Sequence, residues 1–194
     1  MEAEVRDQLA LAFTKGVAEI FKDNLAFAFI FGSVAKGKEK DTSDIDIFVC
    51  SKTKASAQQM KAFNDFYMNL HEEYGFYPDM EYPGEVVDLE FLDLNLDFIK
   101  NWNPCREQRK IRSYRCFEAI FWTAVLAEEK MAVSQRTDDL KDMEAKCKYM
   151  VETWKNTILG REKEYAGMSL LDILSLHGYS FMDTHRPEIY RFDA

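Results

Sequence analysis

The first part of the chain alternates between helix-like and strand-like patterns of apolar residues. Over residues 2–22 apolar side chains recur every three or four positions, which predicts an amphipathic helix. Residues 25–31 are all apolar, as is typical of a strand buried on both faces. A second helical pattern covers residues 56–74 and is expected to end at Gly75. Helices that alternate with strands predict a small α/β core.

A second strand is expected over residues 44–50, between the buried strand and the second helix. Its first half alternates between acidic and apolar side chains: Asp44, Ile45, Asp46 and Ile47. Because successive side chains of a strand point to opposite faces, both aspartates are expected on one face and both isoleucines in the core.

The composition changes after residue 100. Residues 79–91 read as a strand pair or a bent strand, and residues 101–104 as a linker. Helical patterns follow over residues 111–125, over residues 140–154 with Thr137 as the N-cap, and in a short stretch at 170–176. We therefore expect two domains, an α/β (α+β) domain with a small mixed sheet at residues 1–100 and a helical bundle at residues 105–194.

The charge of the chain bears on its partners. It has 34 acidic and 25 basic residues, a formal net charge of -9. The electrostatic field of this negative charge repels a long polyanion, so nucleic acid is not expected as a partner. The basic stretch at residues 106–115 is interpreted as a solvated helix face.

Cysteine, histidine and hydrophobic content suggest a reduced, soluble protein. The cysteines are scattered, without paired metal-ligand spacing, and the histidines also lack such spacing and are interpreted as packed or surface residues: Cys50, Cys105, Cys116, Cys147, His71, His177 and His185. No apolar run is long enough to cross a bilayer, and the first residues lack the basic start of a signal peptide. The expected location is the cytoplasm.

The strongest candidate for chemistry joins a glycine turn to the pair of aspartates. Gly32 and Ser33 follow the buried strand, and ten residues separate Ser33 from Asp44. Such a turn exposes backbone amides and a hydroxyl to an incoming phosphate. Two carboxylates two positions apart on a strand, Asp44 and Asp46, can share hard divalent cations.

This combination resembles the signature of the polymerase-β-like nucleotidyltransferase superfamily. The resemblance rests on the sequence GSVAKGKEKDTSDIDIFV, covers about the first half of the chain, and is closest to the minimal nucleotidyltransferases, here with an added helical domain. It implies that residues 1–100 are the catalytic domain. It also implies that Asp44 and Asp46 bind two Mg²⁺ ions, and that Gly32 and Ser33 hold the triphosphate of a nucleoside triphosphate, with ATP as the expected donor.

The resemblance also implies a third carboxylate on the strand after the second helix. Asp79 is the first acidic residue in an extended setting and is the first choice as a catalytic and metal-binding residue. Glu81, Glu85 and Asp88 remain open, because a slip of one residue in register would turn any of these side chains away from the metals.

The activity that follows is two-metal transfer of a nucleoside monophosphate, with AMP preferred, to a hydroxyl group of a small molecule or a protein. The alternative is an antitoxin-type or other protein-binding module that keeps the nucleotide site and acts through a partner protein. Neither a nucleic acid nor a membrane is expected as a partner.

Overall fold

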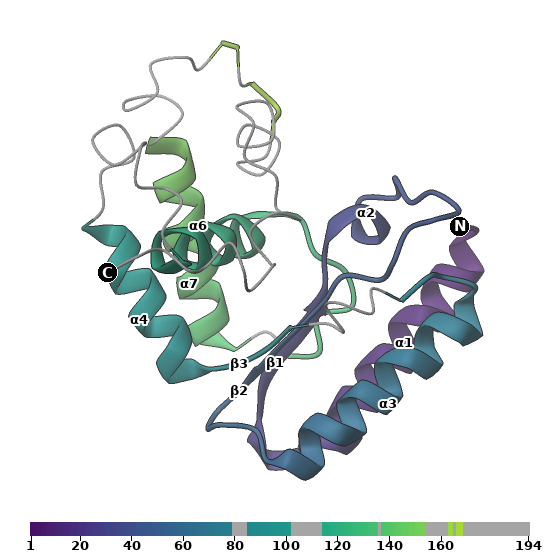
Figure 1. The fold of residues 1–194 in the computed structure, drawn as a ribbon. Helices are drawn as coiled ribbons and strands as arrows, with labels where there is room; N and C mark the ends of the chain where they lie inside the picture. The colour runs from purple at the N-terminus through teal and green to yellow at the C-terminus, as the bar shows by residue number, and fades with distance from the viewer. Residues whose placement is uncertain (79–84, 102–113, 136, 154–162, 165, 169–194) are drawn as a thin grey trace. The chain divides into compact units, whose positions relative to one another are not determined.

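The computed structural model describes residues 1–78, 85–101, 114–135, 137–153, 163–164 and 166–168 (Figure 1). Contacts divide the chain into two compact units. The first is Met1–Phe91 with Glu129–Leu140, and the second holds the described residues of Leu92–Glu128 and Lys141–Ala194. The expected division between residues 100 and 105 stays a prediction, and the contacts add that residues 129–140 pack with the first unit.

The first unit is built on a mixed sheet of three strands, in the order β1-β2-β3. These are β1 (Leu25–Ile30), β2 (Ile47–Ser51) and β3 (Glu85–Asp88). Strand β1 runs antiparallel to β2, and β2 runs parallel to β3. The expected α/β fold with a small mixed sheet is confirmed.

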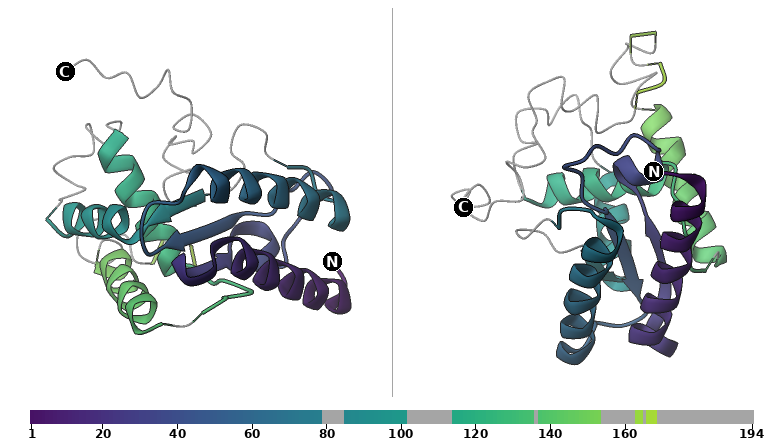
Figure 2. Two further views of the ribbon diagram at one scale, coloured as in Figure 1. Left: turned by 90° about the horizontal axis from the view of Figure 1, so that it is seen from below. Right: turned by 90° about the vertical axis from the view of Figure 1, so that its right-hand side faces the viewer.

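Two long helices cover one face of this sheet, α1 (Ala3–Phe21) and α3 (Ala57–Tyr74) (Figures 1 and 2). A 3₁₀ turn, Lys22–Asn24, links α1 to β1. The apolar stripes of α1 and α3 form the core together with alternate residues of the strands. This core contains Leu9, Phe13, Val17, Ala28, Ile30, Ile45, Ile47, Val49, Phe63 and Tyr67. This burial makes α1 and α3 a rigid support for the segments at the ends of the strands.

The two ends of α3 are defined by local sequence signals. Ser56 and Gln59 form a capping box at its start, with the Ser56 hydroxyl accepting from the Gln59 backbone N–H at 3.2 Å. Gly75 ends the helix in the left-handed conformation, with φ +72°. Both predicted ends of this helix are confirmed.

The opposite face of the sheet carries stacked aromatic rings. Phe29 and Phe48 lie 4.8 Å apart between ring centroids, and Phe27 stacks on Phe48 at 6.1 Å. On the side of β1 away from β2, Met131 pairs with the strand: Ile30 and Met131 exchange two backbone hydrogen bonds. The sequence patterns gave no indication of this pairing.

The described residues of the second unit are mainly helical. They come from α4 (Leu89–Lys100), α6 (Tyr114–Ala127) and α7 (Asp138–Thr153), of which α4 and α7 begin in the first unit. The Thr137 hydroxyl accepts a hydrogen bond from the Leu140 backbone N–H at 3.2 Å, as expected of the N-cap of α7. The helix expected at 170–176 lies outside the described residues.

Two sequence-based expectations about the elements are wrong. The second strand begins at Ile47, not at Asp44, because the Ile45 N–H bonds to a side chain of α3 and not to a neighbouring strand. Residues 89–91 are helical, because Asp88 caps the start of α4 by accepting from the Phe91 backbone N–H at 2.9 Å. The apolar pattern of the sequence did not indicate α4, and residues 79–84 lie outside the described part.

Cys50 and Cys147 are buried and form no disulfide, in agreement with the expectation for these two residues. Cys105 and the Cys116 side chain lie outside the description. Among the described helices, none combines the length and apolar character needed to span a bilayer. The cytoplasmic location stays a prediction.

Candidate active site

The glycine turn lies where the chain leaves β1. Gly32 has a φ of +67°, a left-handed conformation that favours glycine, and begins the one-turn helix α2 (Gly32–Ala35). Ser33 is half-buried, and its carbonyl accepts from the Lys38 backbone N–H at 2.9 Å. The turn therefore places Gly32 and Ser33 at the end of a fully buried strand.

The two aspartates lie next to this turn, immediately before β2. Asp44 and Asp46 are half-buried, whereas Ile45 and Ile47 are buried. The predicted alternation of faces therefore holds although the strand begins later than expected. The Asp46 carbonyl accepts from the Phe31 backbone N–H at 2.9 Å, which ties the aspartates to the end of β1.

Gly32 and the Asp46 side chain are in direct contact. A Cβ atom added to Gly32 would lie 1.8 Å from Asp46 Oδ2 and 2.6 Å from its Cγ. Only a residue without a side chain leaves this space for the carboxylate. Two features that lie fourteen positions apart in the sequence thus meet at one place, as the chemistry proposed for them requires.

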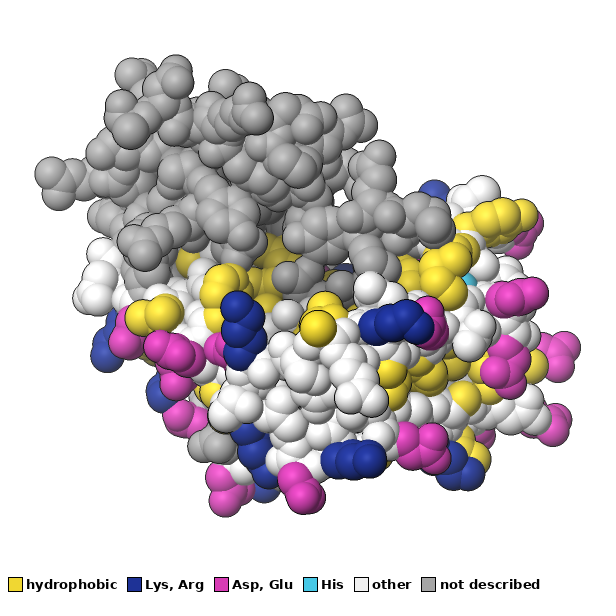
Figure 3. Space-filling view, turned by 60° about the horizontal axis from the view of Figure 1, so that its bottom comes forward, with side chains coloured by type: hydrophobic (Ala, Val, Ile, Leu, Met, Phe, Trp, Pro, Cys, Tyr) yellow, Lys and Arg dark blue, Asp and Glu magenta, His cyan; other side chains and the backbone are white. Residues whose placement is uncertain are grey.

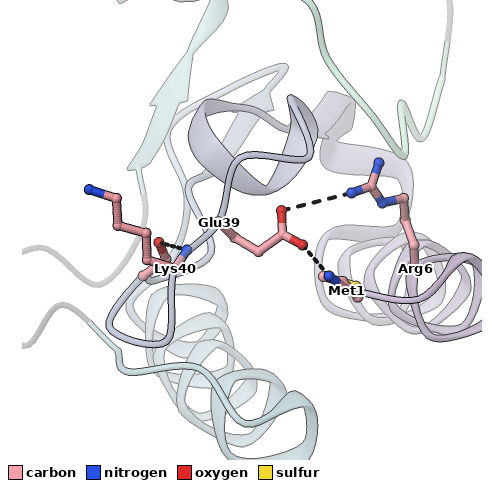
Figure 4. A network of polar contacts seen from close by, with 5 residues as sticks. Met1, Arg6, Glu39 and Lys40 are labelled. Atoms are coloured by element: carbon pink, nitrogen blue, oxygen red, sulfur yellow. Dashed lines mark hydrogen bonds and ion pairs between the residues drawn. The ribbon is translucent and has the colours of Figure 1, made fainter.

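The loop between Ser33 and Asp44 is anchored to the start of α1 (Figure 4). Glu39 Oε1 accepts from the Met1 ammonium at 2.6 Å, and its Oε2 lies 3.8 Å from Arg6 Nη2. The pKa of Glu39 is lowered, mainly by the hydrogen bond from the Met1 ammonium, while its own backbone and Arg6 add to the effect. These contacts reduce the freedom of a glycine-containing loop beside the candidate site.

His71 of α3 lies behind the aspartates and is fully buried. Its Nε2 is 2.7 Å from the Ile45 backbone nitrogen, and its Nδ1 is 2.8 Å from the Tyr67 carbonyl. From the sequence, His71 was expected only to be a packed or surface residue. Its four-residue spacing from Tyr67, on the buried stripe of α3, was the one signal that the imidazole faces the core.

The register of β3 distinguishes among the candidates for the third carboxylate. Glu85 is the partner of Phe48, which follows Asp46 by two positions, so Glu85 has a register position on the same face and near the same end of the sheet. Asp88 pairs with Ser51 at the far end and caps α4. Asp79 and Glu81 lie outside the described residues.

A lysine from the late segment lies on the aromatic face. Lys130 Nζ is 5.2 Å from the centroid of the Phe29 ring, and Phe29 pairs with Phe48 on the face that also carries Asp46. The sequence motif did not include this residue. Within the part of the chain that the structure describes, no three histidine, cysteine or acidic side chains gather into a complete metal site.

The comparison with protein families agrees with this geometry. A family model described as "Polymerase beta, Nucleotidyltransferase" matches residues 15–102. This range contains the glycine turn, both aspartates, His71 and β3. Neither a curated protein nor a solved structure gives a significant match.

Proposed function

The chain carries a nucleotidyltransferase domain of the polymerase-β-like superfamily over residues 15–102, and we propose that it transfers a nucleoside monophosphate, with AMP preferred, from ATP to a hydroxyl group. The acceptor is a small molecule or a protein side chain. The family generally uses nucleoside triphosphates and divalent metal ions. The site of transfer is formed by Gly32, Ser33, Asp44 and Asp46.

The observation that carries this proposal is the contact between Gly32 and the Asp46 carboxylate. A glycine in the left-handed conformation allows a phosphate to approach the backbone of the turn, and the same glycine leaves room for a metal-binding carboxylate. The turn and the acid are therefore close enough to act on one nucleotide. Lys130 adds a positive charge on the same face of the sheet.

Each group has a distinct role in the proposed reaction. The acceptor oxygen attacks the α-phosphorus, a new P–O bond forms, the bond between the α-phosphorus and the α–β bridging oxygen breaks, and pyrophosphate leaves. Gly32 and Ser33 orient the triphosphate, and a carboxylate accepts the hydroxyl proton. Asp44 and Asp46 supply the hard oxygen ligands that Mg²⁺ prefers. Two bound Mg²⁺ ions would stabilise the charge on the attacking and leaving oxygens.

Three candidates remain for the third acidic ligand: Asp79, Glu81 and Glu85. Asp79 was the first choice from the sequence and stays a prediction, because it lies outside the described residues. The register of β3 supports Glu85, which pairs with Phe48 two positions after Asp46, over Asp88, which is engaged at the start of α4.

The charge of the chain supports a small-molecule or protein acceptor. The net charge is -9, and the face drawn in Figure 3 mixes acidic and basic side chains over the described residues. A nucleic-acid enzyme needs a broad basic surface to neutralise several phosphates. Nucleic acid is therefore not the proposed acceptor.

Calorimetry with ATP and Mg²⁺ tests the nucleotide site. We expect wild-type protein to bind, and we expect Asp44→Asn combined with Asp46→Asn to abolish most of the heat, because the metal ligands are lost. Asp41→Asn with Asp65→Asn is the matched control, since it removes the same charge from exposed positions. Equal binding by wild type and the Asp44/Asp46 variant would refute the site.

Transfer is tested with ATP labelled on the α-phosphate, incubated with aminoglycosides, with purified proteins and with cell extract. Label that moves to a small molecule or to a protein hydroxyl, with release of pyrophosphate, would support the proposal. Binding of ATP without transfer to any acceptor would favour the binding-module alternative instead.

A further inference from the structure

His71 is a buried polar side chain with both ring nitrogens engaged. It lies on α3, has no exposed surface, and is separated from Ile45 by 26 positions in the sequence. Polar groups buried in a core are retained when they are hydrogen-bonded, and here one of the two partners is the backbone between the candidate metal ligands.

The hydrogen-bond partners determine the tautomer of His71. The Tyr67 carbonyl can only accept, so Nδ1 carries the proton and donates to it at 2.8 Å. The Ile45 N–H can only donate, so Nε2 accepts from it at 2.7 Å. The imidazole is therefore neutral. Burial lowers its pKa, against the opposing effects of the Tyr67 carbonyl and of the Asp44 charge.

The segment that follows α3 also forms a hydrogen bond with the backbone next to Ile45. Tyr77, three residues after the helix, donates its backbone N–H to the Ser43 carbonyl at 3.2 Å. On the other side the Asp46 carbonyl accepts from Phe31. Tyr77, His71 and Phe31 thus hold the backbone at Ser43, Ile45 and Asp46, and the Ser43 N–H also donates to the Lys40 carbonyl at 2.9 Å. Among these four contacts, only that of His71 comes from a side chain.

We propose that His71 is a positioning residue of the nucleotidyl-transfer site, and this inference rests on the function proposed above. Its Nε2 fixes the peptide between Asp44 and Asp46 and thereby sets the separation and direction of the two carboxylates. Metal affinity depends strongly on groups that orient the ligands, even where those groups do not touch the metal. His71 does this through the backbone of Ile45.

Three variants separate positioning from general stability. Asn at position 71 can occupy the place of Nδ1 but is too short to reach Ile45, whereas Gln extends to about the place of Nε2. Leu70→Ala is the matched control, because Leu70 is a buried neighbour on α3 that packs in the core. Mn²⁺ binding is followed by electron paramagnetic resonance, and transfer by kcat and KM, on full-length protein whose folding is checked by circular dichroism.

We expect His71→Asn to weaken Mn²⁺ binding by about 10-fold to 100-fold, the range for loss of a group that orients a ligand. We expect His71→Gln to recover most of the affinity, and Leu70→Ala to lower the melting temperature while leaving the affinity within about twofold of wild type, as for a site with no shared partner. Wild-type affinity in folded His71→Asn, or an equal loss in Leu70→Ala, would overturn the inference.

A measurement on the wild type covers the case in which His71→Asn does not fold. The ¹⁵N chemical shifts of the His71 ring should show a protonated Nδ1 and an Nε2 that accepts, and they should change when Mg²⁺ is added to wild type but not to Asp46→Asn. A proton on Nε2, or shifts unmoved by Mg²⁺ in protein that binds it, would overturn the positioning role alone. Wild-type protein that binds neither Mn²⁺ nor Mg²⁺ would overturn the proposed function together with this inference.

Discussion

Replacement of Gly32 by alanine tests the contact on which the proposed site depends. The added Cβ would lie 1.8 Å from Asp46 Oδ2, so the carboxylate would have to move by roughly 1.7 Å to restore ordinary van der Waals contact. Because the two nearest atoms lie at the far end of the Asp46 side chain, a change of side-chain rotamer can relieve the clash while the backbone stays in place. Gly32→Ala should therefore reduce activity at the site more than it reduces the stability of the fold.

The two effects have different magnitudes. Alanine in the left-handed conformation costs about 1–2 kcal/mol of folding free energy. A misplacement of about 1 Å at a reacting centre can reduce the rate by ~100-fold, equivalent to roughly 2.7 kcal/mol of transition-state stabilisation. We therefore expect Gly32→Ala to lower the melting temperature by a few degrees and to reduce kcat/KM for AMP transfer by ~100-fold.

Gly75→Ala is the matched control. Gly75 has a similar positive φ, +72° against +67° for Gly32, but a Cβ added there meets nothing within 4 Å. Both variants should lose similar stability in thermal unfolding, and only Gly32→Ala should lose transfer of labelled AMP and binding of Mn²⁺. Wild-type activity in Gly32→Ala would refute the contact argument, and an equal loss of activity in both variants would assign the effect to backbone strain.

Three further predictions concern the third carboxylate, the loop and the acceptor. We expect Glu85→Gln to reduce transfer by more than the ~10-fold to 100-fold typical of a group outside the metal shell, whereas Asp88→Asn should mainly lower the melting temperature; the reverse pattern in transfer assays would contradict the register argument. The folded pKa of Glu39 is below its unfolded value of 4.5, so its contribution to stability is present above that pH and is lost as the pH falls through the folded pKa. Denaturant unfolding should accordingly show that Glu39→Gln lowers the unfolding free energy near neutral pH, and that the difference from wild type shrinks below pH 4.5; a constant difference would argue against the ion pair with Met1. A gel-shift assay with transfer RNA and single-stranded DNA near physiological salt should show no tight complex, and salt-sensitive binding would reverse the choice of acceptor.

The sequence alone determined the features that depend on neighbouring residues. The period of apolar residues identified α1 and α3, and the continuous apolar run identified β1, because burial on one face or on both leaves a direct mark on the sequence. The spacing of Gly32, Ser33, Asp44 and Asp46 was also sufficient to indicate the family, which the match over residues 15–102 confirms. The start of β2 was misplaced, because an acidic and apolar alternation looks the same inside a strand and just before one.

Tertiary structure decided the contacts between segments that are distant along the chain. No local pattern indicates that His71 bonds to Ile45, that Met131 pairs with Ile30, or that Glu85 rather than Asp88 is level with the start of β2. These contacts depend on strand register and on the packing of α3 against the sheet, which the sum of many weak interactions sets after the local elements have formed. The sequence could thus name the two aspartates, but only the fold showed which atoms hold them in place.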